Sequence, residues 1–129
     1  MKTRKIFLDG YVELVPRLFR KKKTINAVSV NSKNNFIGFS KGIMATANVK
    51  IGNGEKLNAT IAIHNSKDKF IVIFEEEGKF AMRRYSPSYN RIVNAGLVDS
   101  LIQCGFENKK YKATSPEQGV IVVTKEEAV

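Results

Sequence analysis

The chain has 129 residues and a formal net charge of +10, with 22 Lys and Arg against 12 Asp and Glu. This length is typical of a single domain, residues 1–129, whose apolar core is large enough to fold without metal ions or disulfide bonds. Cys104 is the only cysteine, which excludes an internal disulfide and a zinc site built from thiolates alone. The longest apolar run, residues 70–74, is far shorter than the roughly 20 residues that cross a bilayer.

The first 25 residues form a basic segment. Residues 1–23 carry eight basic and two acidic side chains, so they hold +6 of the net charge. The pair Asp9-Gly10 stands between two apolar stretches and predicts a tight hairpin turn, because both residues tolerate a positive φ. Asp9 and Glu13 also interrupt the apolar region that a signal peptide would need. We therefore expect residues 1–25 to be a basic N-terminal hairpin or arm of a cytoplasmic protein.

The part of the chain after the basic segment alternates between strand and helix patterns. Alternating apolar residues over 26–31 and 36–40 predict two strands joined by a polar turn. Apolar residues at helical spacing then predict a short helix over 41–49. Two runs rich in β-branched residues, 57–64 and 70–75, predict two further strands.

A second series of elements follows. Residues 80–85 alternate and predict a strand. The run 87–104 has apolar residues every three to four positions, which predicts one long helix with one apolar face. Ser86 is a good N-cap for this helix, and Gly105 can adopt the left-handed conformation that follows a helix end. A buried strand is predicted over 120–123.

The elements divide the chain into two halves, 26–78 and 79–125. Phe39-Ser40 with its following elements parallels Tyr85-Ser86 with its own, at an offset that drifts from 46 to 49 residues. Two such halves facing each other would form one core, although any α+β chain can look periodic at this level. The predicted fold is a single α+β domain: a small, strongly curved antiparallel sheet or barrel with two helices. Whether its two halves are pseudo-repeats is left open at this point.

Short motifs in residues 27–75 follow a known order. Phe39-Ser40 precedes the predicted short helix, Ile51-Gly52 follows it, and Gly54-Glu55 occupies the next turn. With this order the segment resembles the AbrB and MazE-like family of bacterial regulators and antitoxins, which have Ile-Pro, Leu-Gly and Gly-Asp at these places. The resemblance implies a swapped-hairpin β-barrel made by two interleaved chains. It also implies DNA contacts from basic side chains near the barrel, here Lys33 and Lys41.

No residues form a recognisable catalytic, cofactor or metal site. His64 is the only histidine and falls in the predicted strand 57–64, where we expect a structural role. Gly52 and Gly54 lack the residues of a phosphate-binding loop and predict a turn. Three consecutive glutamates, residues 75–77, would point to alternating faces of a strand and so form no acid–base pair. We therefore expect a protein that is not an enzyme and uses no cofactor and no metal.

The positive charge predicts a polyanionic partner. Nucleic acid is the natural candidate, because each phosphate that a Lys or Arg neutralises releases counterions. A helix starting near Ser86 would also present amide groups close to Arg84 and Arg91, a favourable place for phosphate. Tyr85 is a candidate surface for stacking an unpaired base. The predicted nucleic-acid-binding residues are Arg20, Lys21, Lys22, Lys23, Lys41, Arg83, Arg84, Tyr85 and Arg91.

The predicted function is non-catalytic nucleic-acid binding by a regulatory or accessory factor, with DNA favoured over RNA. The alternative is a protein-binding module that inhibits or modulates a partner protein, since electrostatic steering favours such an encounter equally well. Either function suits a monomer or a homodimer, and no membrane contact is expected.

Overall fold

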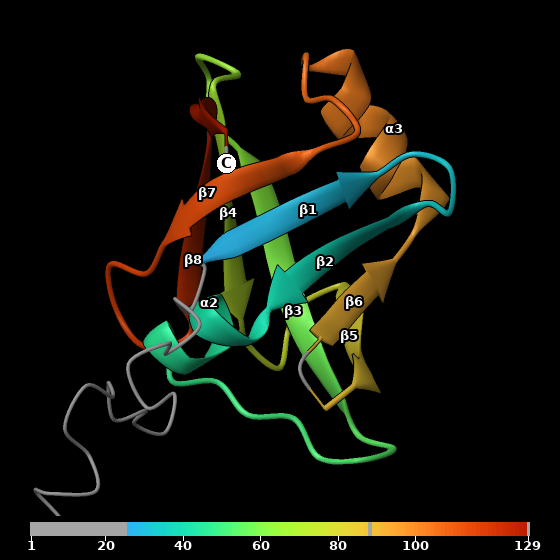
Figure 1. Cartoon of the computed structure of the whole chain (residues 1–129), viewed down its shortest axis with the longest axis vertical. Coiled ribbons are helices and arrows are strands. Elements are labelled where there is room, and N and C mark those ends of the chain that lie inside the picture. Colours follow the sequence, from blue (N-terminus) through green and yellow to red (C-terminus); the bar gives the residue numbers. More distant parts are fainter. Residues whose placement is uncertain (1–25, 88, 129) are drawn as a thin grey trace, which may run out of the picture.

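The computed structural model describes residues 26–87 and 89–128. The predicted basic segment 1–25, with its hairpin and with Arg20, Lys21, Lys22 and Lys23, lies outside the described residues. The described chain forms a closed barrel of antiparallel strands with two helices (Figure 1). Of the predicted antiparallel sheet or barrel with two helices, the barrel with helices is compatible with this structure.

Eight strands make up the barrel: β1 (Ala27–Asn31), β2 (Phe36–Ser40), β3 (Lys56–Ile63), β4 (Lys69–Phe74), β5 (Phe80–Ser86), β6 (Tyr89–Val93), β7 (Lys110–Thr114) and β8 (Val120–Ala128). Helix α2 (Lys41–Thr46) follows β2, and helix α3 (Ala95–Gln103) follows β6. Around the barrel the strands are ordered β1-β2-β6-β5-β3-β4-β8-β7, and β7 pairs with β1 to close it. Closure leaves no open sheet edge among these strands.

Apolar side chains from alternate strand positions fill the barrel, because successive residues of a strand point to opposite faces. Three aromatic rings pack edge to face inside it: the centroids of Phe70 and Phe106 are 5.1 Å apart, and those of Phe106 and Tyr111 are 5.2 Å apart. The hydroxyl of the buried Tyr111 accepts a hydrogen bond from the backbone N–H of Glu107 at 2.6 Å. Other fully buried side chains are those of Val28, Ile37, Phe39, Ile43, Val72, Met82, Val98, Leu101, Ile121 and Val123.

The first helix is shorter than predicted. It was expected over 41–49, but α2 ends at Thr46. Its start is capped by Ser40, whose Oγ accepts a hydrogen bond from the backbone N–H of Ile43 at 3.3 Å. Asn48 has φ 52°, in the left-handed region, which turns the chain out of the helix.

The helix predicted over 87–104 is wrong in its first half. Tyr89–Val93 form β6, which pairs with both β2 and β5, and α3 begins only after it. Asn94 is the N-cap, since its Oδ1 accepts a hydrogen bond from the backbone N–H of Leu97 at 2.9 Å. Ser86 is instead the last residue of β5, and Pro87 lies in the turn between β5 and β6. Hydrogen bonding to the two neighbouring strands, β2 and β5, therefore makes this segment a strand, although its apolar residues have helical spacing.

The element order occurs twice along the chain, as β1-β2-α2-β3-β4 and as β5-β6-α3-β7-β8. Exchanging the two halves leaves the strand pairing unchanged. The pair β1–β2 becomes β5–β6, β3–β4 becomes β7–β8, and β1–β7 becomes β5–β3, while β2–β6 and β4–β8 map onto themselves. The capping residues Ser40 and Asn94 are equivalent in this exchange. The sequence alignment of Ser40 with Ser86 is therefore wrong, because it assumed that the second helix began at Pro87.

Candidate nucleic-acid interface

A row of register-paired residues crosses the outside of the barrel from β7 to β3. Cross-strand partners point to the same face of a sheet, and the pairings link β7 to β1, β1 to β2, β2 to β6, β6 to β5, and β5 to β3. We call this set the basic row; in spatial order it consists of Lys110, Ser29, Gly38, Arg91, Arg83 and Lys56. Lys110 is thus separated from the other three cations of the row by two small residues, Ser29 and Gly38.

The cations of the basic row are not neutralised within the described part of the chain. The ion pair found there joins Lys109 to Glu107 at 3.4 Å, and it involves no member of the row. Arg83 and Arg91 are directly opposite each other on β5 and β6, so two like charges repel across this pair. Beside them is a groove of about 280 Å³ whose lining includes Lys79 together with both arginines. A phosphate bound here would relieve the repulsion, and guanidinium groups match phosphate oxygens in pairs.

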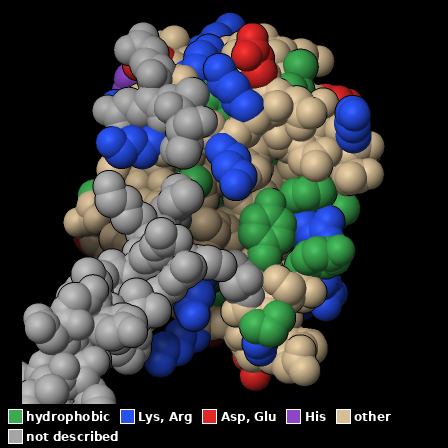
Figure 2. Space-filling view, viewed as in Figure 1, with side chains coloured by type: hydrophobic (Ala, Val, Ile, Leu, Met, Phe, Trp, Pro, Cys, Tyr) green, Lys and Arg blue, Asp and Glu red, His purple; other side chains and the backbone are tan. Residues whose placement is uncertain are grey.

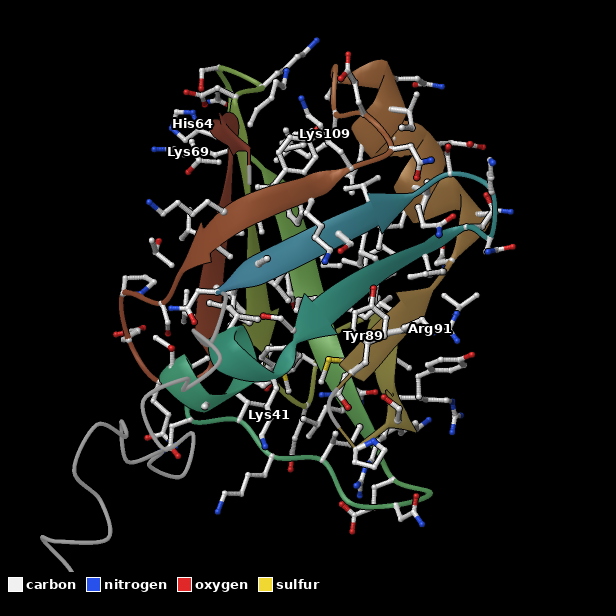
Figure 3. All side chains as sticks on the ribbon, in the orientation of Figure 1. Lys41, His64, Lys69, Tyr89, Arg91 and Lys109 are labelled. Atoms are coloured by element: carbon white, nitrogen blue, oxygen red, sulfur yellow. The ribbon has the colours of Figure 1, made fainter. Side chains whose placement is uncertain are left out.

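Aromatic rings lie beside the basic row on the same face. The Arg91 guanidinium carbon is 3.2 Å from the centroid of the Tyr85 ring and 4.5 Å from that of Phe36. Tyr89 meets both rings edge to face, with centroids 6.4 Å from Tyr85 and 6.3 Å from Phe36. Tyr85 is 68% exposed, whereas Phe36 is buried. Figure 2 shows hydrophobic and basic side chains gathered together on this face, and Figure 3 shows Tyr89 and Arg91 next to each other on β6.

Gly38, a member of the basic row, determines where the Tyr89 ring lies. A Cβ atom at Gly38 would overlap the hydroxyl end of the Tyr89 ring, so the ring can cross β2 only because residue 38 is glycine. We expect Gly38→Ala to displace this ring and to weaken oligonucleotide binding several-fold. The loss of stability should be small, since only the end of one side chain must move. Fluorescence anisotropy with a labelled oligonucleotide and thermal unfolding measure the two effects. An unchanged affinity would show that the position of Tyr89 does not matter for binding.

The structure brings together only some of the predicted site residues. Arg83, Tyr85 and Arg91 lie together in the interface. Arg84 follows Arg83 in β5 and therefore points to the other face, where it lines a pocket at the end of the barrel with Lys41. In Figure 3 Lys41 lies at this end, away from Tyr89 and Arg91. The four predicted residues of the basic segment, residues 20–23, lie outside the described part.

The phosphate site expected at a helix start near Ser86 is wrong. Helix α3 begins at Ala95, after β6, and so its first turn is separated from Ser86 by the whole length of that strand. The two lysines that the resemblance singled out are also not brought together. Lys33 lies in the turn before β2, and Lys41 follows the end of the same strand.

Sequence reasoning missed several members of the interface. Lys56, Phe36, Ser29 and Gly38 carry no motif, and their roles follow only from register. The lysines around Tyr111 were not missed, because Lys109, Lys110 and Lys112 form a basic cluster in the sequence that predicts a contribution to binding. In β7, Lys110 and Lys112 are exposed on either side of the buried tyrosine. That alternation indicates a strand with an outward basic face.

His64 lies far from the interface, at the end of β3 (Figure 3). Its Nδ1 is 2.7 Å from the hydroxyl of Ser66, which also hydrogen-bonds the Asp68 carboxylate. The hydrogen bond from Ser66 lowers the pKa of Asp68 below its ordinary value. A mostly apolar cavity of about 450 Å³ adjoins this turn, with His64 and Lys69 in its lining.

Comparisons with models of protein families, with curated proteins and with solved structures each find no match to this chain. Within residues 26–87 and 89–128, no three His, Cys, Asp or Glu side chains lie together in a way that could hold a metal ion. In the same ranges no helix is long and apolar enough to cross a membrane. Function is therefore inferred from the geometry of the interface.

Proposed function

We propose that this protein binds single-stranded nucleic acid without catalysis, as a regulatory or accessory factor. The observation that carries this proposal is the exposed Tyr85 ring held against Arg91, directly beside a row of cations that have no acidic partner among the described residues. An aromatic ring with a free face stacks on any base, and a neighbouring positive groove follows the phosphates. Binding of a single strand uses both the aromatic ring and the positive groove, and both lie on one face of this barrel.

In the proposed complex the strand runs along the outer face of β5 and β6. Arg83 and Arg91 hold phosphates in the groove that they line with Lys79. The adjoining base stacks on Tyr85. Phe36 and Tyr85 keep the Arg91 guanidinium in place through cation–π contacts, so little side-chain entropy is lost when it binds phosphate.

The choice of DNA over RNA is supported by the resemblance to the AbrB and MazE-like family. In that family two chains interleave their hairpins to make one barrel. We propose that here a duplicated unit supplies both halves from a single chain, a view supported by the strand pairing that is unchanged when the halves exchange. A single chain then closes its own barrel, and dimerisation is not required for the interface.

Binding of fluorescently labelled oligonucleotides tests the proposal. We expect single-stranded DNA to raise the anisotropy at about 50 mM salt and to dissociate steeply as salt increases, because counterions compete for the phosphates. Duplex DNA and single-stranded RNA of the same sequence are the matched probes for strandedness and sugar. Absence of binding to any of these probes at about 50 mM salt would contradict the proposal and favour the alternative of a protein partner.

A further inference from the structure

A third pocket, separate from the groove beside Arg83 and from the cavity near His64, lies at one end of the barrel, between α2 and the turn that joins β5 to β6. Its volume is about 330 Å³, and we call it the barrel-end pocket. Its polar lining consists of Lys41, Lys50, Arg84 and Asn90, and Met44 and Ile51 are among its apolar walls. Arg84 and Asn90 face each other as a cross-strand pair. The pocket is thus on the opposite face of the β5–β6 hairpin from Tyr85 and Arg91.

Three cations from separate segments converge on this pocket: Lys41 from the start of α2, Lys50 from the loop after α2, and Arg84 from β5. Among the described side chains, none of the three has an acidic partner, and the lining contains no Asp or Glu. Cations that focus on one concave site raise the local concentration of anions. Lysine and arginine together favour a compact, multiply charged group such as phosphate.

Asn90 gives an independent indication that a ligand binds here. Its side chain is only 9% exposed, and its Oδ1 has no hydrogen-bond partner in the described structure. A buried acceptor without a donor is costly, and nearly all such atoms in proteins are paired. At the second position of β2, the equivalent strand of the other half, stands Ile37, which is fully buried. The barrel therefore accepts an apolar residue at such a position, so packing in the core does not explain the polar side chain of Asn90.

We infer that the barrel-end pocket binds a sugar phosphate, either free or as the phosphorylated end of a nucleic-acid strand. The phosphate is held by Lys41, Lys50 and Arg84, and a sugar hydroxyl hydrogen-bonds the side-chain amide of Asn90, which lines the pocket. The pocket volume of about 330 Å³ is at the lower end of the range of small-molecule sites, roughly 300–1,000 Å³, which suits a sugar phosphate and exceeds what a bare phosphate needs. Met44 and Ile51 offer apolar surface to the carbon skeleton. This inference does not depend on the basic row, which lies on the other face.

Isothermal titration calorimetry with ribose 5-phosphate tests the inference. We expect ribose 5-phosphate to bind the full chain about tenfold or more tightly than ribose, because charge-assisted hydrogen bonds to phosphate are lost in the neutral sugar. Arg84→Gln should weaken binding of ribose 5-phosphate about tenfold. Lys67→Gln removes an exposed cation from the turn between β3 and β4, outside both proposed sites; it is the control and should leave this affinity unchanged.

The variant Asn90→Leu tests the contact with the sugar hydroxyl separately from the contacts between the cations and the phosphate. Removing the unpaired acceptor should raise the midpoint of thermal unfolding of the free protein, while ribose 5-phosphate binds about fivefold more weakly. The variant thus raises the stability of the free protein and lowers its affinity for ribose 5-phosphate. An asparagine with only a structural role would not produce this combination. Arg84 is exposed, so its variant tests the pocket even where Asn90→Leu disturbs the barrel.

Two oligonucleotides, one with a 5′-phosphate and one with a 5′-hydroxyl, distinguish the sources of the sugar phosphate. A preference for the phosphorylated strand that disappears in Arg84→Gln assigns the pocket to strand ends. Equal binding of the two strands, together with binding of ribose 5-phosphate, assigns it to a free sugar phosphate. Ribose 5-phosphate that binds no better than ribose, or equally well to Arg84→Gln, would overturn the inference while leaving the proposal for the outer face intact.

Discussion

Replacing Tyr85 with alanine is expected to weaken binding of single-stranded DNA about tenfold or more, because stacking of a base on an aromatic ring contributes roughly 1–3 kcal/mol. The side chain is 68% exposed and its ring is held by Arg91, so the platform is formed before the strand arrives. The salt dependence of the binding constant should hardly change, since no charge is removed. Anisotropy titrations at several salt concentrations measure both quantities.

Two controls separate stacking from phosphate contact. Tyr85→Phe keeps the ring and should bind nearly as the unmodified chain does, and Ile102→Ala, at an exposed position on α3, should have no effect. Arg83→Gln should instead reduce the slope of log K against log salt by about 0.7, the value for one phosphate contact on a single strand. An affinity that survives Tyr85→Ala would contradict the stacking role and move the base-binding surface elsewhere.

Gly78→Ala is expected to destabilise the fold by about 2–3 kcal/mol, the cost of overpacking a site that cannot relax. A Cβ at residue 78 would lie 2.5 Å from the backbone nitrogen of Ala59 and 2.7 Å from its Cα. Ala59 is fully buried and pairs with Phe74 on one side and Phe80 on the other, so its backbone is held in the barrel and cannot move away. Urea or thermal unfolding of the purified chain measures the loss.

Gly96→Ala is the matched control for this prediction. Gly96 is exposed in the first turn of α3, and a Cβ there would have only an ordinary contact of 3.5 Å with Asn94 Oδ1. Alanine favours helix over glycine by up to about 1 kcal/mol, so this variant should be as stable as the unmodified chain or more stable. Equal stability losses in the two variants would show that the close approach of Gly78 to Ala59 is not the cause.

Local pattern was enough to predict most of the strands. Residues 36–40 and 70–75 alternate or are rich in β-branched side chains, and the barrel contains strands at both places. The start of α2 was also predictable, because Ser40 is a standard capping residue. The segment 89–93 was not predictable in this way. Its residues fit both a helical stripe and an inward–outward alternation, and only its pairing with β2 and β5 decides between them.

The same reason explains why the candidate interface was predicted only in part. Arg83, Tyr85 and Arg91 are close in sequence, and the sequence by itself determined that this stretch is basic and aromatic, just as it determined the excess positive charge and the alternating strands. Which cations share a face was decided only by the tertiary structure. Lys110, Ser29 and Lys56 join the row through cross-strand register, and Arg84 leaves it because successive strand residues point to opposite faces. Register depends on contacts between distant segments, and no local pattern of residues encodes it.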